Sequence, residues 1–349
     1  MSLLHVLANP NAQSGRGGRI LPELEAALRS SGHEVRLQRT THPGHARRLV
    51  AGLAAEGEPA PIVVVGGDGT LHEVANGLRD AGFPDGYPLA ILPVGTGNDF
   101  HRILRAGTGV AEVMQLLSGG IPRKLDLGEV RWAGGDAAFV NLLGVGIDVE
   151  VLRRRGAFAR FPGLIQYGAA LLSALRKFHP VPLRVTTSAP PGARDPGTEA
   201  DSGTEADSGA EADSGTKADS GAATEPRAAA DPCAASLERP ALLAVATVGP
   251  SIGGGFMLSP DARADDGLLD LFFVEPLSLP QVLRYLPRVV RGTLGTPDRI
   301  HRATFGSARF VAADGRAFPF ELDGELMPDS TPWLEMGVLP GALTVLDRP

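Results

Sequence analysis

The chain of 349 residues carries 33 Lys and Arg against 40 Asp and Glu, and with 43% hydrophobic residues it can build two domains of about 150 residues, each with its own core. The one cysteine, Cys233, excludes an internal disulfide and a cysteine-based zinc site. No apolar run approaches the ~20 residues that a membrane-spanning helix needs, and no basic leader precedes the first apolar stretch. We therefore expect a cytoplasmic protein without a secretory signal.

The N-terminal third alternates short apolar runs with helical patterns. Strands are predicted at Leu3–Ala8, Glu34–Gln38, Pro61–Val65 and Leu89–Leu92, and helices at Arg19–Ser30, His45–Glu56 and Leu71–Leu78. Strands and helices that alternate at this spacing form a parallel sheet with helices on both faces, and such sheets bind ligands at the carboxyl ends of their strands. Residues 1–123 are therefore predicted to form a doubly wound α/β domain.

After about Arg123 the pattern changes to short strands joined by Gly-rich turns. Strands are predicted at Leu125–Arg131, Ala138–Leu143, Leu183–Thr187, Leu242–Val248 and Leu268–Val274, and helices at Leu164–Lys177 and Pro280–Arg291. This predicts a β-rich, sandwich-like second domain over residues 124–349. The tail after about residue 303 adds short strands, and the sequence does not decide whether the tail stays in this domain or returns to the first.

The second domain is interrupted by an acidic segment, residues 189–240. It contains the six-residue units GTEADS, GTEADS, GAEADS and GTKADS in tandem from Gly197 to Ser220, and it includes Cys233. A composition so poor in apolar groups cannot offset its ordering entropy, so we predict a disordered insertion. The segment holds 11 acidic and 4 basic residues, which leaves 29 of each sign elsewhere and no charge excess that would favour nucleic acid.

The sharpest local signal is the segment from Ile62 to Glu73, IVVVGGDGTLHE. Its glycines allow the backbone to approach a ligand, and Thr70 and Glu73 form a capping-box pattern that opens a helix whose free N–H groups suit a phosphate. Asp68 would repel a phosphate unless a divalent metal lay between them, so a nucleotide with Mg²⁺ fits the pattern. A tight turn that merely needs glycine is the simpler alternative.

Two further Gly-rich loops follow predicted strands. Residues 9–18 follow the first strand, and PVGTGNDF at Pro93–Phe100 follows the fourth. Three such loops at successive strand ends converge on one crevice of the sheet. Neither GxxxxGK[ST] nor GxGxxG stands at the required place, which disfavours a Walker-type NTPase and a Rossmann dehydrogenase.

Six motifs stand in the order seen in the diacylglycerol kinase catalytic-domain family, and the chain resembles this family over nearly its whole length outside the insertion. They are Asn9-Pro10, GGDGT at Gly66–Thr70, PVGTGNDF at Pro93–Phe100, GVGID at Gly144–Asp148, GGGFMLSPDARADDGLLD at Gly253–Asp270 and LDGE at Leu322–Glu325. That family includes bacterial soluble lipid kinases and is similar to sphingosine and ceramide kinases. The resemblance implies an ATP-dependent kinase that holds its nucleotide between two domains and phosphorylates a lipid hydroxyl, first of all that of diacylglycerol to give phosphatidic acid.

The resemblance also implies roles for matching residues. Glu325 is the expected proton acceptor with Asp323 beside it, and Asp68 is the third carboxylate of the catalytic group. The residues expected to hold or support the nucleotide are Asn9, Thr40, Gly66, Gly67, Asp68, Gly69, Thr70, Glu73, Gly95, Thr96, Asn98 and Asp99. A separate, structural Mg²⁺ is expected on the Asp266 carboxylate and the backbone oxygens of Arg263 and Leu268. Without the other motifs, the pairs Asp266-Gly267 and Asp323-Gly324 would be equally typical of hairpin turns.

Two alternatives stay open at this point. One is a kinase that shares GGDGT but has another acceptor, such as an NAD kinase or a phosphofructokinase, and the other is a silent nucleotide- or lipid-binding regulator. The spacing of PVGTGNDF and the late LDGE disfavour the first, and the intact Asp68, Asp323 and Glu325 disfavour the second. The eight histidines show no paired-ligand spacing, so no zinc site is assigned.

A lipid kinase must touch a membrane or accept a delivered lipid. Residues 152–179 and 279–294 interleave arginine with apolar residues, which suits an anionic bilayer and suits equally an amphipathic helix packed on a sheet. We expect a cytoplasmic, peripherally membrane-associated protein with transient membrane contact and no nucleic-acid partner. The sequence does not identify the lipid acceptor, and it leaves the oligomeric state open, with a homodimer among the alternatives.

Overall fold

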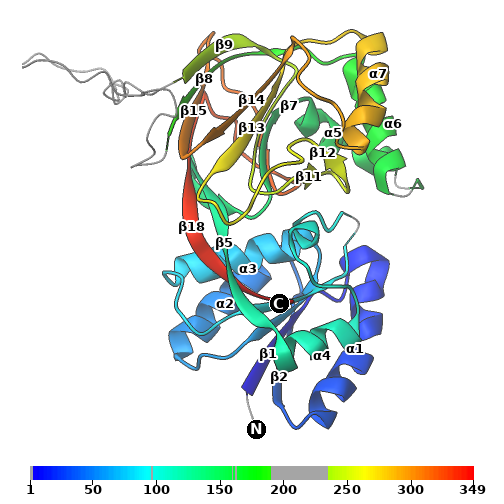
Figure 1. The fold of residues 1–349 in the computed structure, drawn as a ribbon, viewed down its shortest axis with the longest axis vertical. Helices are drawn as coiled ribbons and strands as arrows, with labels where there is room; N and C mark the ends of the chain where they lie inside the picture. Colours follow the sequence, from blue (N-terminus) through cyan, green and yellow to red (C-terminus); the bar gives the residue numbers. More distant parts are fainter. Residues whose placement is uncertain (1–2, 96, 159, 162, 190–234) are drawn as a thin grey trace, which may run out of the picture.

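The computed structural model describes residues 3–95, 97–158, 160–161, 163–189 and 235–349. Figure 1 shows two domains, one above the other, joined by two long strands. The tandem repeat, Cys233 and the predicted nucleotide-binding residue Thr96 lie outside the described residues. Among the helices within the described ranges, none combines the length and the apolar character needed to cross a bilayer.

The N-terminal domain is built on parallel strands in the order β2-β1-β3-β4. The strands are β1 (Leu3–Ala8), β2 (Glu34–Arg39), β3 (Ile62–Gly66) and β4 (Leu89–Pro93), and the helices are α1 (Ala12–Ser30), α2 (His45–Glu56), α3 (Asp68–Asp80) and α4 (Val110–Gly119). Alternate residues of β3 face opposite sides: Val63 packs in a cluster with Leu24 of α1, whereas Val64 packs in a cluster with Val74 of α3. The predicted doubly wound α/β architecture is confirmed.

Two long antiparallel strands, β5 (Ile121–Trp132) and β18 (Trp333–Asp347), run through both domains (Figure 1). Val345 near the end of β18 pairs with Leu89 of β4, so the C-terminal tail returns to the first domain. In the second domain the same sheet continues through β15 (Ser307–Ala312), β8 (Val181–Ser188) and β9 (Ala235–Ala241), while β6 (Gly135–Phe139) pairs with β5.

A second sheet of six strands packs on this extended sheet. Its strands, in spatial order, are β14 (Ile300–Phe305), β13 (Leu269–Val274), β10 (Leu243–Thr247), β7 (Leu142–Gly146), β16 (Phe320–Leu322) and β17 (Glu325–Leu326). Phe310 of the first sheet and Phe320 of the second lie fully buried in one shared core. The predicted β-rich, sandwich-like domain is confirmed.

The outer face of the second sheet is covered by helices. They are α5 (Ile147–Arg155), α6 (Gly163–Leu175) and α7 (Leu279–Val290), accompanied by the short hairpin of β11 (Ser251–Ile252) and β12 (Phe256–Met257) and by single turns at η1 (Phe100–Ile103) and η2 (Gly156–Phe158). Side chains of these helices share a cluster with Val245 and Phe272 of the sheet. Figure 1 shows α6 and α7 side by side at one end of this domain.

The observed elements differ from the sequence prediction at five places. Helices α4 and α5 were not predicted, and α1 begins at Ala12 rather than Arg19, with left-handed backbone at Gln13, Ser14 and Gly15. The single strand predicted at Ala138–Leu143 is two strands, because the backbone N–H groups of residues 140–142 turn to a carboxylate instead of a neighbouring strand. The predicted insertion, residues 189–240, extends too far, because residues 235–240 belong to β9, which pairs with β8.

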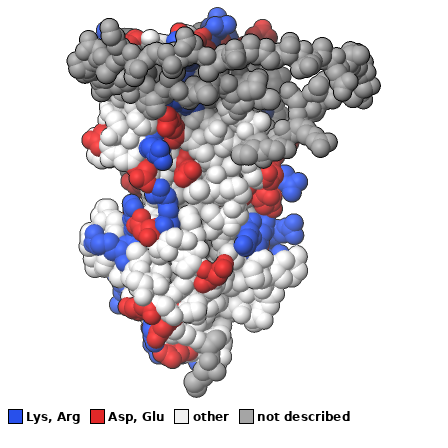
Figure 2. All heavy atoms as spheres, turned by 90° about the vertical axis from the view of Figure 1, so that its left-hand side faces the viewer, with Lys and Arg blue, Asp and Glu red and all other residues white. Residues whose placement is uncertain are grey.

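Charged side chains of both signs are interspersed over the face that carries β15 and β18 (Figure 2). Neighbouring strands pair them: Arg309 lies 3.4 Å from Glu335, and Arg184 lies 2.7 Å from Glu238. Exposed pairs of this kind add little stability, about 0–1 kcal/mol each. The described part of this face therefore has balanced charge.

We expect that replacing residues 190–234 by a four-residue Gly/Asn turn leaves the fold intact. Thr187 of β8 pairs directly with Ala235 of β9, so a short connection can close this hairpin. The shorter loop reduces the entropy of closure and should raise the free energy of unfolding by up to about 2 kcal/mol. Thermal unfolding measures the change. A matched deletion of residues 190–241, which also removes β9, should lower the midpoint, and equal losses in both variants would contradict the prediction.

Candidate active site

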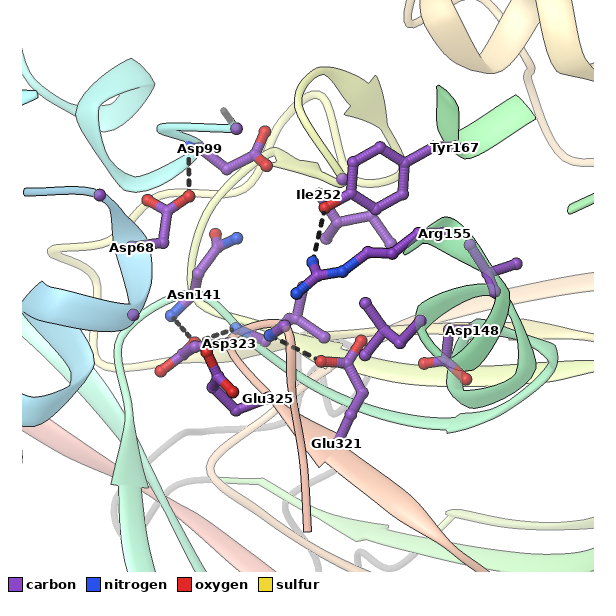
Figure 3. Close-up of a pocket in the computed structure, with 18 of the residues that line it drawn as sticks. Asp68, Asp99, Asn141, Asp148, Arg155, Tyr167, Ile252, Glu321, Asp323 and Glu325 are labelled. Atoms are coloured by element: carbon purple, nitrogen blue, oxygen red, sulfur yellow. Dashed lines mark hydrogen bonds between the residues drawn. The ribbon is translucent and has the colours of Figure 1, made fainter. Parts of the chain in front are cut away.

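One cavity of about 820 Å³ lies between the two domains. Its lining includes the loops that follow β1, β3 and β4, the turn between β16 and β17, and side chains from α5, α6 and α7. The end toward the first domain is polar, and the end within the second domain is apolar. Figure 3 shows the region where the two ends meet, with acidic side chains from both domains around it.

The three Gly-rich loops meet at the carboxyl edge of the parallel sheet, as the sequence predicts. Asn9 after β1 donates a hydrogen bond to the Thr70 hydroxyl at 3.3 Å. A Cβ on Gly67 would lie 2.9 Å from the Cα atom of Gly95, so the loops after β3 and β4 can touch only because both residues are glycine. Gly66 itself ends β3, where a Cβ would collide with Thr70.

Asp68 begins α3 and lines the cavity. Its carboxylate accepts the backbone N–H groups of Asp99 (3.1 Å) and Phe100 (3.2 Å). Burial, with a contribution from the neighbouring Asp99 charge, raises the pKa of Asp68 to about 6. Carboxylate oxygens are ligands that Mg²⁺ prefers, and a cation would favour the ionised form, so the Asp68 carboxylate could hold a Mg²⁺ ion.

Asp99 links the two domains. Its carboxylate accepts the Ser251 hydroxyl at 2.8 Å and the Gly254 N–H at 2.6 Å, both from the β11–β12 hairpin. Burial raises the pKa of Asp99, while these donors oppose the shift. The neighbouring Asn98 has left-handed backbone, with φ of 52°, and donates to the Gly95 carbonyl oxygen at 3.1 Å. These contacts support the loop, as the sequence suggests, while Asp99 also fastens the loop to the second domain.

Thr40 and Glu73 flank the same loops. Thr40 is buried and lines the cavity, as do Gly69 and Thr70. The Glu73 carboxylate accepts the N–H groups of Gly44 and Ala46, each at 2.8 Å, and so caps the start of α2. Glu73 therefore positions the loop that carries Thr40, and its proposed nucleotide contact remains a prediction.

The Asp323-Gly324-Glu325 turn joins β16 and β17 and faces these loops. Asp323 is buried with left-handed backbone, φ of 50°, and its carboxylate has four donors: the N–H groups of Val140 (2.8 Å), Asn141 (2.7 Å) and Leu142 (2.9 Å), and His72 Nδ1 (2.7 Å). With its lone pairs engaged, Asp323 positions the turn. A hydrogen bond between His72 of α3 and this turn was not predicted.

Glu325 lies on the other side of the same turn and is exposed to the cavity. A Cβ on Gly69 would lie 3.3 Å from Glu325 Oε1, so the carboxylate faces the GGDGT loop across the domain boundary. It forms no hydrogen bond or ion pair with any described residue. The geometry thus divides the two carboxylates, leaving Glu325 available to accept a proton and Asp323 committed to hold the turn.

Further polar residues line the cavity beyond this turn and were not assigned from the sequence. They are Asn141, Asp148, Arg155, Tyr167 and Glu321, labelled in Figure 3. Asp148 was noted only as the end of GVGID and Arg155 only as one of many basic residues, because no local pattern marks either as a cavity residue. Glu321 reads as an ordinary strand residue before LDGE.

Asp148 and Glu321 form an acidic pair in the wall of the cavity. The Asp148 side chain covers Gly144, where a Cβ would meet both carboxyl side chains. Burial raises the pKa of Asp148 to about 7 and raises that of Glu321 well above its ordinary value, with a further increase from the nearby Asp148 charge. The Glu321 carboxylate accepts the Gly324 N–H at 2.7 Å. Asp148 Oδ2 is buried and has no hydrogen-bond partner among the described residues.

The apolar end of the cavity is lined by aliphatic and aromatic side chains. They come from α5 to α7 and from the outer face of the second sheet, and include Val151, Leu171, Leu175, Leu242, Phe272, Val274, Val282, Tyr285, Val289, Leu294 and Ile300. Among the described lining residues, Asp148 and Arg155 are the charged side chains nearest to this end, and the end itself has none. This end suits a hydrocarbon chain.

The stretch predicted to hold a structural Mg²⁺ lies outside this cavity, between β12 and β13. Asp266 accepts the Leu268 N–H at 3.1 Å, and burial raises the pKa of Asp266. Asp126 of β5 fastens the loop by accepting the Gly267 N–H at 2.7 Å. No group of three or more metal-binding side chains gathers anywhere in the described ranges. A site on Asp266 and two backbone oxygens, of Arg263 and Leu268, needs no such group and remains a prediction.

Two family models match the chain. The diacylglycerol kinase catalytic domain matches residues 3–130, and the YegS C-terminal NAD kinase beta sandwich-like domain matches residues 141–347. The "Probable lipid kinase YegS-like" of Pseudomonas aeruginosa is 31% identical over 322 residues, which cover 92% of this chain and 87% of that protein. The "Putative lipid kinase YtlR" of Bacillus subtilis is 31% identical over 205 residues, 54% of this chain, and the match spans less than two thirds (64%) of that relative.

A solved structure has the same fold. The crystal structure of a "putative diacylglycerol kinase" from Bacillus anthracis aligns over 100% of this chain and 95% of its own, with a TM-score of 0.69 and 22% sequence identity. At this identity the likeness concerns the fold.

We expect Asp148→Asn to raise the thermal midpoint more at pH 8 than at pH 5. The folded-state pKa of about 7 lies above the ordinary value of 3.8, so the stability that the protonated carboxyl contributes below pH 3.8 is lost progressively as the pH rises from there to about 7. Asparagine stays neutral throughout. Calorimetry between pH 5 and 8 measures the difference, with Asp85→Asn in an exposed turn as the control. A midpoint that falls at pH 8 in the variant would contradict this assignment.

Proposed function

The chain belongs to the diacylglycerol kinase catalytic-domain family of lipid kinases, and we propose that it transfers the γ-phosphate of ATP to the hydroxyl of diacylglycerol. The observation that carries the proposal is the position of Glu325. Its carboxylate faces Gly69 of the GGDGT loop and borders a cavity whose other end is apolar. A phosphate donor on one side and a lipid hydroxyl on the other would therefore meet at this carboxylate.

The nucleotide would lie at the carboxyl edge of the parallel sheet. Backbone N–H groups at the start of α3 and the positive end of its dipole suit the phosphates, and Asn9, Thr40 and Thr70 border the same space. Asp68 would hold Mg²⁺ there, which neutralises phosphate charge when bound. Thr96, Asn98 and Gly95 belong to the adjoining loop, and their direct contacts with nucleotide are part of the proposal.

The transfer itself needs a base and a positioned acceptor. A bond forms between the lipid hydroxyl oxygen and the γ-phosphorus, the bond from phosphorus to the β–γ bridging oxygen breaks, and ADP leaves. Glu325 accepts the hydroxyl proton as the new bond develops. Asp323 keeps Glu325 in place through the four hydrogen bonds that fix the turn.

An uncharged acceptor suits the boundary between the two ends of the cavity. The raised pKa values of Asp148 and Glu321 favour their protonated forms, which can donate hydrogen bonds to hydroxyl and ester oxygens and accept hydrogen bonds from hydroxyl groups. The acyl chains would occupy the apolar end. The match of the first domain to the diacylglycerol kinase catalytic domain supports the same acceptor. A kinase with a water-soluble acceptor would leave this apolar end without a use.

Helix α7 is the part of the protein that we propose touches the membrane. Leu279, Leu283 and Val290 are 52%, 50% and 37% exposed and are spaced along one face, while Val282 and Val289 of the same helix line the apolar end of the cavity. Exposed Arg284, Arg288 and Arg291 lie beside the apolar face. An anionic bilayer complements this combination, and the helix would then stand between the bilayer and the lipid site.

We expect Glu325→Gln to lower kcat for diacylglycerol phosphorylation by about 10²–10⁴-fold with nucleotide affinity unchanged, because the variant loses only the proton acceptor. The measurement is Mg²⁺-dependent transfer of labelled γ-phosphate in mixed micelles to diacylglycerol, sphingosine, ceramide and phosphatidylglycerol. Label on another lipid would revise the acceptor. Absence of label on all four lipids, with ATP still bound, would contradict the proposed activity.

We expect Leu283→Gln to weaken binding to vesicles that contain phosphatidylglycerol by about tenfold, as loss of one inserted leucine removes roughly 1.5 kcal/mol. Co-sedimentation measures the partition. Ile121→Gln is the matched control, since Ile121 is 45% exposed and lies at the start of β5 in the first domain. If both variants bind vesicles as the wild type does, α7 is not the membrane contact.

A further inference from the structure

The polar end of the cavity is short of positive charge. Asp68, Glu325, Glu321 and Asp148 all line it, and a nucleoside triphosphate would add further negative charge. Only two arginines and no lysine are found among its described lining residues, Arg47 and Arg155. Arg47 is already engaged, because its Nε and Nη2 atoms donate to the two carboxylate oxygens of Asp80 at 2.5 and 2.7 Å.

Arg155 is the cation that remains available. It ends α5, and within the described chain its guanidinium donates one hydrogen bond, to the Tyr167 hydroxyl at 3.1 Å, and forms no ion pair. The two arginines before it are engaged outside the cavity, since Arg153 and Arg154 both contact Glu150, at 2.6 and 3.4 Å. An arginine left unpaired among carboxylates in a cavity retains its donors for a ligand.

Its position is fixed from two sides. A Cβ on Gly324 would lie 3.8 Å from Arg155 Nη1, so the guanidinium borders the same turn that carries Glu325. Tyr167, its hydrogen-bond partner, lies with Cδ1 3.5 Å from a Cβ placed on Gly253, next to the Gly254 N–H that binds Asp99. Figure 3 shows the guanidinium between Asn141 and Glu321, pointing into the space enclosed by Asp68, Asp99 and Glu325.

We propose that Arg155 is a catalytic residue that binds the phosphoryl group during its transfer. This inference rests on the proposed function. The planar guanidinium offers several N–H donors in a geometry that matches phosphate oxygens, and negative charge on those oxygens is what the transfer must stabilise. Arg155 comes from the second domain, whereas the phosphate-binding loops belong to the first. The transfer site is therefore completed by a cation supplied across the domain boundary, with Tyr167 as its positioning residue.

The chemistry that Arg155 recognises is a phosphate, and a phosphate can come from two sources here. One is the γ-phosphate of ATP, which we propose. The other is the phosphodiester of an anionic acceptor lipid such as phosphatidylglycerol. Kinetics distinguish the two sources. If Arg155 binds the γ-phosphate, its loss lowers kcat with every acceptor lipid. If Arg155 binds a lipid headgroup, its loss raises KM only for the lipid that carries that headgroup.

The test compares Arg155→Ala, Arg155→Lys and the control Arg153→Ala, which removes the same charge from the same helix outside the cavity. We expect Arg155→Ala to lower kcat with diacylglycerol about 10²–10³-fold, and Arg155→Lys to lower it less. Arg153→Ala should retain wild-type kcat. Dissociation constants for ATP and ADP form a second readout: Arg155→Ala should lose the tighter binding of ATP relative to ADP. Guanidinium ions added to Arg155→Ala should restore part of the activity.

Several outcomes would overturn the inference. A kcat for Arg155→Ala within threefold of wild type would exclude a role in transfer. A normal kcat with diacylglycerol together with a raised KM for phosphatidylglycerol would assign Arg155 to a lipid phosphate. Equal weakening of ATP and ADP with a lower thermal midpoint would make it a structural residue. If the wild type labels no lipid, the proposed function fails, while the difference between ATP and ADP affinity still tests Arg155.

Discussion

The carboxylate of Asp323 is the interaction on which the site depends. It collects three consecutive backbone N–H groups from the junction of β6 and β7 and a ring nitrogen of His72 from the first domain. Removing the Asp323 carboxylate would leave several buried donors without an acceptor, and each unsatisfied donor would cost about 1–3 kcal/mol of stability. The same carboxylate therefore breaks a strand in two, holds Asp323 at positive φ, and sets the Glu325 side chain against the GGDGT loop.

Two further links keep the cavity at the domain boundary. Strands β5 and β18 of the extended sheet run through both domains, with one irregularity in their register between Leu339 and Leu343, and Asp99 connects the loop after β4 to the β11–β12 hairpin. These links connect the two halves of the site. In the proposed transfer one domain would hold the phosphate donor and the other the acceptor, so catalysis by positioning would depend on them.

Several carboxyl groups lie close together at the domain boundary, and their negative charges would repel one another if all were ionised. Burial raises the pKa of Asp68, Asp148 and Glu321, so the protein keeps part of this cluster neutral near physiological pH. Asp68 would hold a metal ion that neutralises phosphate charge, and Arg155 would add a second positive charge under the proposal above.

Local sequence pattern was enough to predict the architecture of the first domain and the loops that line its part of the site. The alternation of strands and helices predicted the doubly wound domain, and Gly66, Gly67 and Gly95 stood where loops must touch. Local pattern could not single out Arg155 as a cavity residue, because Arg153, Arg154 and Arg155 look alike in sequence and differ in the direction that the helix gives their side chains. The pairing of Asp148 with Glu321 and of His72 with Asp323 joins residues that are far apart in the sequence, 251 positions in the second pair. Spacing along the chain carries information about neighbours in one helix or strand, and only the packing of separate elements decides which distant side chains share a cavity.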